Sequence, residues 1–354
     1  MSEDVPRSLT RQIRVGDVPI GGGAPVAVQS MLTVHTDQPQ EALVQIAELA
    51  EAGCEIVRVA IPSNRELAGF AQIAECSELP VVADIHFDYR LALEAARLGA
   101  AKLRINPGNI GDGDMVDAII DAAGEAEIPI RIGVNAGSLA PEIADFEDLS
   151  LAEKLAASAE SYVEHFQERG FQDIIVSAKA HEVASTVSAY RLLARDLPQL
   201  PLHLGITEAG TLLQGAVKSA AGIGALLLDG IGDTLRVSLT ADPVEELKVA
   251  WLLLSAVGLR HRQPELVSCP TCGRTEVDMM HIAAEVEQRL AAVDKPISVA
   301  VMGCVVNGPG EARGADVGVA CGRGKGAVFS RGKVLYTVGE DQIIDALFEE
   351  IERL

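Results

Sequence analysis

Eight short runs of β-branched and aliphatic residues alternate with longer amphipathic runs between residues 26 and 258, and this alternation constrains the fold more than any other feature. Strands that alternate with helical segments build a parallel sheet. Eight such units in about 230 residues predict a (β/α)₈ barrel, an α/β fold. The expected strands are Val26–Ser30, Glu55–Ile61, Val81–His86, Lys102–Asn106, Ile130–Asn135, Asp173–Lys179, Leu202–Thr207 and Thr234–Leu239, with Ala225–Asp229 as a second candidate for the eighth.

The helical runs between these strands often end at glycine, as helices commonly do. The clearest are Gln40–Ala52, Tyr89–Leu98, Leu151–Arg169 and Glu182–Asp196. A doubly wound open sheet is the alternative fold, and it would be favoured by a glycine-rich turn after the first strand. Because Gly21–Gly23 precedes that strand instead, the barrel is preferred and is expected to occupy residues 1–260.

The alternation stops after Leu259, and the remainder predicts a separate small α+β domain over residues 261–354. Residues 261–268 are interpreted as a linker. The domain is expected to contain helices at Val277–Ala292 and Asp341–Arg353 and strands at Ile297–Val301, Val317–Ala320 and Lys333–Val338.

Charge and hydropathy argue against two classes of function. The formal net charge of −22 is opposite to the basic surface that general nucleic-acid binding needs. No run approaches the roughly 18 apolar residues of a membrane span, and Met1–Ser8 lacks the apolar core of a signal peptide. The chain is therefore expected to be soluble and cytoplasmic.

Polar side chains gather at the carboxyl ends of the expected strands, where barrel enzymes keep their active sites. Several cations in one barrel mouth repel one another unless an anion neutralises them, and guanidinium groups match phosphate oxygens. The pattern therefore predicts a substrate that carries a diphosphate. The full set is Arg58, Asp84, His86, Arg104, Asn106, Arg131, Asn135, Lys179, Thr207, Glu208, Arg236 and Ser238.

Two alternatives stay open for these residues. Any single arginine could instead face outward and pair with a helix carboxylate. His86 and Glu208 are candidates for acid or base, but a lone histidine at a strand end is about as often a hydrogen-bonded core residue.

Four of the six cysteines lie in the last quarter of the chain. Cys269 and Cys272 form a C-x₂-C turn, a spacing that zinc ribbons, redox dithiols and iron–sulfur clusters share. The second C-x₂-C of a zinc ribbon does not occur in the sequence. Cys304 adds a third thiol among glycines, and an iron–sulfur cluster usually takes four ligands. Residue type favours Cys321 over Glu311 as the fourth.

These motifs resemble those of the bacterial 4-hydroxy-3-methylbut-2-enyl diphosphate synthases over nearly the whole chain. The most specific segments are SCPTCGRT at residues 268–275 and GCVVNGPGE at residues 303–311. The barrel segments are VQSM at 28–31, IVRVA at 56–60, ADIHF at 83–87, LRINPGN at 103–109, IGVNAGSL at 132–139, HLGITEAG at 203–210 and DGIGDTLRVSL at 229–239.

The resemblance implies a barrel followed by a cluster domain related to the sulfite/nitrite reductase fold. It implies a [4Fe–4S] cluster held by Cys269, Cys272, Cys304 and, in place of Cys321, the carboxylate of Glu311. It also implies that the diphosphate is bound by Arg58, Arg104, Arg131 and Lys179. The rest of the pocket would be His86, Asn106, Asn135, Thr207, Glu208, Arg236 and Ser238, with Asn307 from the cluster side.

The implied activity is the two-electron reductive ring opening and dehydration of 2-C-methyl-D-erythritol 2,4-cyclodiphosphate, in non-mevalonate isoprenoid synthesis. Glu208 would donate a proton, and Glu311 would yield its ligand position to the substrate. Flavodoxin or ferredoxin would supply the electrons. A homodimer would bring the barrel of one chain to the cluster of the other.

Two other functions fit parts of this pattern. A barrel enzyme acting on a phosphorylated substrate, with a structural zinc at Cys269, Cys272 and Cys304, predicts a colourless protein without redox activity. A cluster-bearing regulatory sensor would need a DNA-binding or partner-binding module, and the acidic chain shows no basic helix–turn–helix pattern.

Five basic residues follow the cysteine motifs closely in sequence. An acidic protein needs a local basic surface to bind an acidic electron carrier such as flavodoxin. We expect that surface to consist of Arg313, Arg323, Lys325, Arg331 and Lys333.

Overall fold

The structure is a computed structural model, and it describes residues 7–275, 277–293, 295–304 and 312–354. The chain divides into two compact units, Met1–Arg260 and His261–Leu354, and each is described by itself. Within the described ranges, no helix is long and apolar enough to cross a bilayer. Two expected site residues, Asn307 and Glu311, lie outside the described residues.

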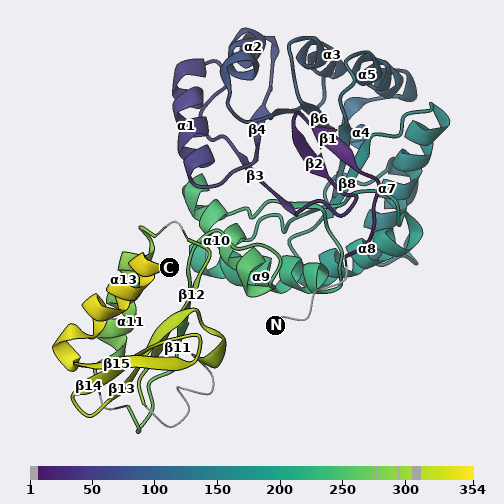
Figure 1. Cartoon of the computed structure of the whole chain (residues 1–354). Helices are drawn as coiled ribbons and strands as arrows, with labels where there is room; N and C mark the ends of the chain where they lie inside the picture. The colour runs from purple at the N-terminus through teal and green to yellow at the C-terminus, as the bar shows by residue number, and fades with distance from the viewer. Residues whose placement is uncertain (1–6, 276, 294, 305–311) are drawn as a thin grey trace. The chain divides into compact units, whose positions relative to one another are not determined.

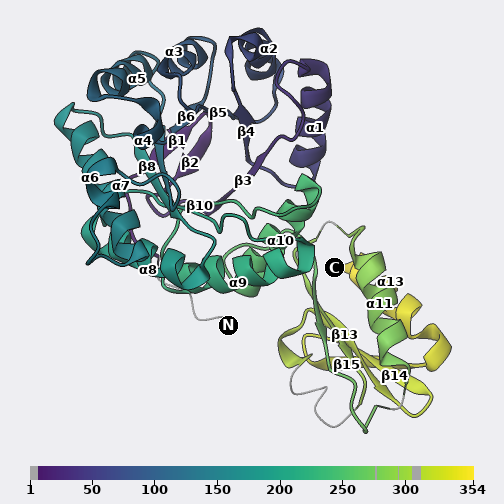
Figure 2. The ribbon, with the colours of Figure 1, turned by 180° about the vertical axis from the view of Figure 1, so that it is seen from behind.

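The first unit is a parallel barrel surrounded by a ring of helices (Figures 1 and 2). Its strands are β3 (Ala27–Met31), β4 (Ile56–Ala60), β5 (Val81–Asp84), β6 (Lys102–Ile105), β7 (Ile130–Asn135), β8 (Ile174–Lys179), β9 (His203–Leu204) and β10 (Thr234–Leu235). Their order is β8-β7-β6-β5-β4-β3-β10-β9, and a parallel bridge between Val176 and Leu202 closes the ring. The predicted (β/α)₈ barrel is confirmed.

Helices follow the barrel strands along the chain, and several begin at a side-chain cap. Ser150 and Glu153 form a reciprocal capping box, and Asp88, Asp112 and Asp242 cap three other helices with their carboxylates. The helices are α1 (Pro39–Glu51), α2 (Leu67–Cys76), α3 (Tyr89–Arg97), α4 (Pro107–Ile110), α5 (Gly113–Glu125), α6 (Pro141–Ala144), α7 (Leu151–Glu168), α8 (Val183–Asp196), α9 (Leu212–Leu228) and α10 (Pro243–Ala256).

The second candidate for the eighth strand is wrong. Residues 225–228 belong to α9, and Asp229 caps its carboxyl end. A short apolar run cannot be distinguished from a buried helical segment by periodicity, and here the helix buries Leu226 and Leu227 against the barrel. The eighth strand is β10, although only Thr234 and Leu235 keep strand geometry.

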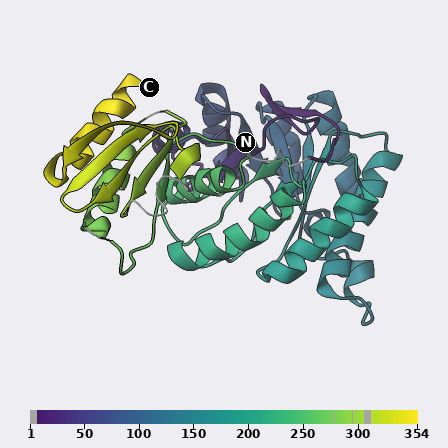
Figure 3. The same cartoon turned by 60° about the horizontal axis from the view of Figure 1, so that its bottom comes forward.

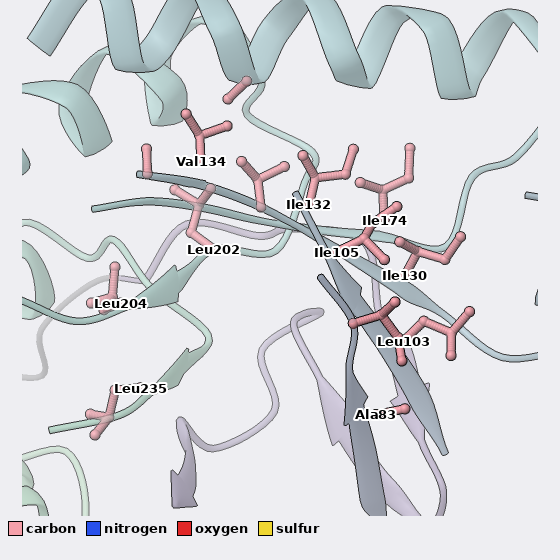
Figure 4. Close-up of a cluster of buried hydrophobic side chains, with 14 of the residues drawn as sticks. Ala83, Leu103, Ile105, Ile130, Ile132, Val134, Ile174, Leu202, Leu204 and Leu235 are labelled. Carbon is pink, nitrogen blue, oxygen red and sulfur yellow. The ribbon is translucent and has the colours of Figure 1, made fainter. Parts of the chain in front are cut away.

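The two faces of the barrel sheet differ in chemistry. Ile130, Ile132 and Val134 of β7 project together from one side of the strand into the main hydrophobic core (Figure 4). Successive side chains of a strand point to opposite faces. Arg131 and Gly133 therefore face the inside of the barrel, which is unusually polar.

A hairpin that the sequence did not reveal precedes the barrel. Its strands β1 (Ile13–Val15) and β2 (Val18–Ile20) are antiparallel. Ile13, Val15 and Ile20 form one apolar cluster with the first inward residues of the barrel strands, including Ile56 and Ile175. The hairpin thus covers the amino-terminal end of the barrel, and the other end is left for binding.

The second unit is a five-stranded sheet with two helices (Figure 3). Its elements are β11 (Glu265–Ser268), α11 (Met279–Leu290), β12 (Ser298–Met302), β13 (Val317–Gly322), β14 (Lys325–Ser330), β15 (Lys333–Gly339) and α13 (Ile343–Arg353). Both helices pack against the same face, where Val286, Leu347 and Val319 share a core. The predicted α+β character is confirmed.

Residues 265–268 were interpreted as part of a linker, and this is wrong. They form β11, which pairs in parallel with β12. Their burial pattern as an edge strand is weak, which explains why alternation did not reveal them.

The five basic residues do not form one surface. Met302 pairs with Ala320, so the thiol-bearing end of β12 lies beside the carboxyl end of β13, where Arg323 and Lys325 follow. Arg331 lies at the other end of β14, a strand about 17 Å long. Lys333 and Arg313 adjoin that distant turn. The antiparallel reversal of β14 therefore separates residues that are close in sequence.

Candidate functional site

The interior of the barrel concentrates positive charge. Six cationic side chains enter it from neighbouring strands, namely Arg58, Lys102, Arg104, Arg131, Lys179 and Arg236. Lys102 and Arg131 are fully buried, at 0% and 1% exposed. Two carboxylates, Asp84 and Glu246, form the ion pairs with these cations among the described residues.

Asp84 holds one half of this charge in place. Its carboxylate lies 3.1 Å from an Arg104 terminal nitrogen, 3.7 Å from Arg58 Nε and 3.5 Å from His86 Nε2. Burial alone would raise the pKa of Asp84, but the charge of Arg58, the hydrogen bond from His86 and the charge of Arg104 hold it well below its usual value. Asp84 therefore stays ionised and orients three expected site residues.

Glu246 orients the remaining arginine. This carboxylate enters from α10, is 4% exposed, and accepts from Arg236 Nε and a terminal nitrogen at 3.3 Å. Its second role is to accept the backbone N–H of Leu239 at 2.8 Å, which fixes the segment that carries Ser238. Arg236 and Arg58 both also contact the sulfur of Met31.

The other half of the interior has donors without counterions. Lys102, Arg131 and Lys179 form no ion pair with a carboxylate among the described residues. Burial, followed by the charge of Arg131 and its neighbours, lowers the pKa of Lys179 and of Lys102 well below the ordinary value. Arg131 Nε and both ring nitrogens of buried His203 have no hydrogen-bond partner within the part of the chain that the structure describes. Such groups need an anion or water.

Two interior glycines make room for the cations. A Cβ at Gly205 would lie 2.5 Å from Lys179 Nζ and 2.9 Å from the Arg236 carbonyl oxygen. A Cβ at Gly133 would lie 2.8 Å from Arg104 Nε. Both strands therefore lack a side chain at the point where a neighbouring cation crosses them.

The remaining expected residues surround the mouth. Asn106 is engaged within the protein, since its amide donates to the Ser138 carbonyl at 3.1 Å and accepts from Gly108 N at 3.1 Å. Asn135 ends β7, while Thr207 and Ser238 follow β9 and β10 and are partly buried. The structure brings these residues to the same end of the barrel as Arg104 and Lys179.

Two residues at the mouth have strained backbone. Phe87, directly after His86, has φ of +67°, and Glu208, directly after Thr207, has φ of +53°. Residues other than glycine seldom adopt such angles, and strain of this kind concentrates at functional sites. Both side chains are exposed.

The expected thiol ligands are only partly assembled. Cys269 and Cys304 follow the carboxyl ends of the adjacent parallel strands β11 and β12, and the Gly303 N–H donates to Cys269 Sγ at 3.1 Å. Cys272 is exposed in the turn after Cys269. Within the described ranges, no three histidine, cysteine or acidic side chains are grouped closely enough to hold a metal.

Cys321 lies differently from these three. It is 0% exposed and belongs to the apolar core beneath α11 and α13. Burial, followed by the charges of Glu340 and Cys269, raises the pKa of the Cys321 thiol to about 12. A protonated thiol in an apolar core is a poor metal ligand, so the preference for Cys321 from residue type has no geometric support.

Several residues of the interior were missed from sequence. Lys102 could have been found, because it lies two residues before Arg104 and must share its face. His203 has the same relation to Thr207, four residues later. Glu246 and Met31 carried no signal, since a glutamate on a helix and a methionine on a strand have ordinary solvent-facing and core roles.

Comparisons with known proteins agree with both units. The family model described as GcpE TIM-barrel domain matches residues 10–251, and that described as GcpE protein C-terminal domain matches residues 265–353. Among solved structures, a dihydropteroate synthase from Coxiella burnetii covers 71% of this chain and 100% of its own, with 13% identity and a TM-score of 0.49, too distant to inform the site.

Curated relatives extend over both units. A protein of Anoxybacillus flavithermus named 4-hydroxy-3-methylbut-2-en-1-yl diphosphate synthase (flavodoxin) is 52% identical over 100% of this chain and 97% of its own length. Proteins of the same name are 52% identical in Geobacter sulfurreducens, over 98% of each chain, and 54% identical in Salinispora arenicola, over 98% of this chain and 89% of the relative. With both family models matched in order and half of all positions identical, the chain belongs to the GcpE family.

Proposed function

We propose that this protein catalyses the reductive ring opening and dehydration of 2-C-methyl-D-erythritol 2,4-cyclodiphosphate to (E)-4-hydroxy-3-methylbut-2-enyl diphosphate, with electrons from flavodoxin. The observation that carries this proposal is the barrel interior, where six cations face two carboxylates at the end that barrel enzymes use for catalysis. The name of the relatives supports this activity over that of a zinc-containing barrel enzyme.

The diphosphate would bind across the two halves of the interior. Arg131 and Lys179, with Lys102 beneath them, lack a carboxylate partner among the described residues and would neutralise the phosphate oxygens. The three orienting contacts on the other side keep Arg58, Arg104 and Arg236 in fixed positions. Ion pairing is strong here because the site is buried and its effective dielectric constant is low.

The polar residues of the mouth would orient the rest of the substrate. Those proposed to contact it are His86, Asn106, Asn135, Thr207 and Ser238, with Asn307 from the second unit. Glu208 is proposed as the proton donor, because its strained backbone holds an exposed carboxyl group at the mouth. A proton from Glu208 Oε would allow the departing hydroxyl group to leave as water.

We propose that Cys269, Cys272, Cys304 and Glu311 hold a [4Fe–4S] cluster. The donor set fits, because three thiols follow two adjacent strand ends and one tight turn, and thiolates are the usual ligands of such clusters. A Cβ at Gly303 would lie 2.6 Å from Met279 Cγ, so only glycine lets Cys304 follow β12 so closely. When bound, the cluster would supply single electrons to the reaction.

Metal content and colour test this proposal directly. Protein purified without oxygen should be brown, contain about four irons per chain, and convert the cyclic diphosphate when supplied with reduced flavodoxin. Cys304→Ser should lose iron, colour and turnover. Cys76→Ser is the matched control, because Cys76 is an exposed thiol on α2 of the barrel, and it should keep all three. A colourless protein with one zinc would exclude the redox reaction.

We also propose that the active enzyme is a homodimer in which the barrel of one chain works with the cluster of the other. The support is the family resemblance, and subunit mixing tests it. Lys179→Met and Cys304→Ser should each be inactive alone. A one-to-one mixture that exchanges subunits should regain about a quarter of wild-type activity, because half the dimers are mixed and each has one intact site. A mixture that stays inactive after proven exchange would contradict the shared site.

A further inference from the structure

We propose that the thioether of Met31 is a positioning group that holds Arg58 and Arg236 side by side for one anionic ligand. The identity of that ligand rests on the proposed function. The role of the sulfur itself rests on contacts within the barrel.

The sulfur lies between the two guanidinium groups. Met31 is the last residue of β3, whose neighbours in the sheet are β4, which carries Arg58, and β10, which Arg236 follows. Met31 Sδ accepts from Arg58 Nε at 3.2 Å and from a terminal nitrogen of Arg58 at 2.8 Å. It also accepts from a terminal nitrogen of Arg236 at 3.4 Å. In the described part of the chain, no other side chain contacts both arginines in this way.

The outer side of each arginine is fixed by a carboxylate. Asp84 Oδ2 lies 3.7 Å from Arg58 Nε, and Glu246 Oε2 lies 3.3 Å from Arg236. These carboxylates come from different elements and pull the two cations apart, as their mutual repulsion also does. Met31 is thus the link in a chain of contacts that runs from Glu246 through both arginines to Asp84 and Arg104.

A thioether suits this place because it is neutral. A carboxylate between the arginines would bind them more strongly, but it would also cancel the charge that attracts an anion. A sulfur accepts weakly and leaves both cations charged. Leucine would fill the same volume without accepting a hydrogen bond, and glutamine would accept through Oε1 at similar length.

This difference separates positioning from packing. Exchange of methionine for leucine is usually tolerated where a side chain only fills space, whereas a polar amide in such a place is not. The positioning role predicts the reverse order, with Met31→Gln better than Met31→Leu. Met115→Leu and Met115→Gln are matched controls, because Met115 is a partly buried methionine on α5 without a guanidinium contact.

The experiment measures binding of inorganic pyrophosphate to the full-length, anaerobically purified protein by calorimetry. Met31→Leu should weaken binding about 5-fold, the typical effect of one lost hydrogen bond. Met31→Gln should stay within about 2-fold of wild type, as should both Met115 variants. For turnover, Met31→Leu should raise KM for the cyclic diphosphate and leave kcat nearly unchanged, because the lost contact serves ground and transition states alike.

A second readout does not need the ligand. The Arg58 Nε–H resonance, observed in ¹⁵N-labelled protein, should be protected from solvent exchange in wild type and Met31→Gln and lose this protection in Met31→Leu. Leucine that binds pyrophosphate as well as methionine, or glutamine that binds worse than leucine, would overturn the positioning role. If wild type binds no pyrophosphate, the proposed function fails, while the Arg58 resonance still decides the role of Met31.

Discussion

At the scale of single residues, the site depends on side chains that are absent as much as on those present. Gly205 adopts no unusual φ, so its need for glycine comes from space alone. The ammonium of Lys179 and the carbonyl oxygen of residue 236 occupy the volume that a Cβ would take.

Gly205→Ala should therefore displace Lys179 and weaken pyrophosphate binding by about 10-fold or more, since a buried cation–phosphate contact is worth upwards of 1.5 kcal/mol. Calorimetry measures this change. Gly224→Ala is the control, because Gly224 lies within α9 with nothing near its missing Cβ, and alanine there should stabilise the helix without altering affinity. Equal affinity in wild type and Gly205→Ala would contradict the assignment of Lys179.

His203 belongs to the same scale and links stability to pH. Burial, followed by the charges of Lys179, Arg131, Lys102 and Arg58, lowers its pKa well below 6.5 in the folded protein. As pH falls below 6.5, the unfolded chain binds a proton that the folded chain does not. The stability that His203 contributes is therefore present above this pH and is lost below it.

Chemical denaturation between pH 7 and 5 should show this loss, with up to about 1.4 kcal/mol per pH unit from this one group. In His203→Gln, which cannot titrate, the slope should fall by about one proton. A variant at exposed His281 should keep the wild-type slope. An unchanged slope in His203→Gln would show that the buried imidazole is not the titrating group.

At the scale of elements, each end of the barrel has its own task. The β1–β2 hairpin closes the amino-terminal end with apolar side chains, and the arginine contacts lie at the other end. Helix α10 connects the two tasks, because it packs in the outer core and sends Glu246 to Arg236.

Ile20→Ala in the hairpin should lower the free energy of unfolding by about 2–5 kcal/mol, because it opens a cavity at a fully buried position. Pyrophosphate affinity of the folded fraction should not change. Leu213→Ala, at a residue 79% exposed, should affect neither quantity. Loss of affinity in Ile20→Ala at a temperature where it is folded would contradict the division of tasks between the two ends.

At the scale of the whole molecule, the chain consists of two compact units, and all proposed cluster ligands belong to the second. A cofactor that binds only the folded state stabilises the unit that holds it. Its removal by oxidation and chelation should lower the unfolding temperature of the second unit and leave the barrel transition in place.

Hydrogen exchange followed by mass spectrometry can measure this unit by unit. Amides of β12 and β13 should exchange faster after cofactor removal, while those of β7 and β8 should not change. Cys304→Ser should reproduce the fast exchange without chelator, and Cys76→Ser should not. Equal acceleration in both units would contradict a cofactor held by the second alone.

The sequence by itself determined the architecture of the barrel, because its alternation of strand and helix periods leaves one closed arrangement of short right-handed units. It also located most of the cations, since strand ends converge in this fold and residues of equal parity share a face. Lys102 follows from the same rule. The hairpin at residues 13–20 and β11 escaped because three- and four-residue strands carry too little periodicity.

Only the tertiary structure decided how those charges are divided. Asp84 and Glu246 reach their arginines from a different strand and from a helix, and Met31 joins two arginines 178 positions apart in the numbering. The five basic residues of the second unit separate because β14 reverses direction. Local patterns record which face a residue occupies, but a partner across the barrel depends on closure of the ring, and no local pattern carries that information.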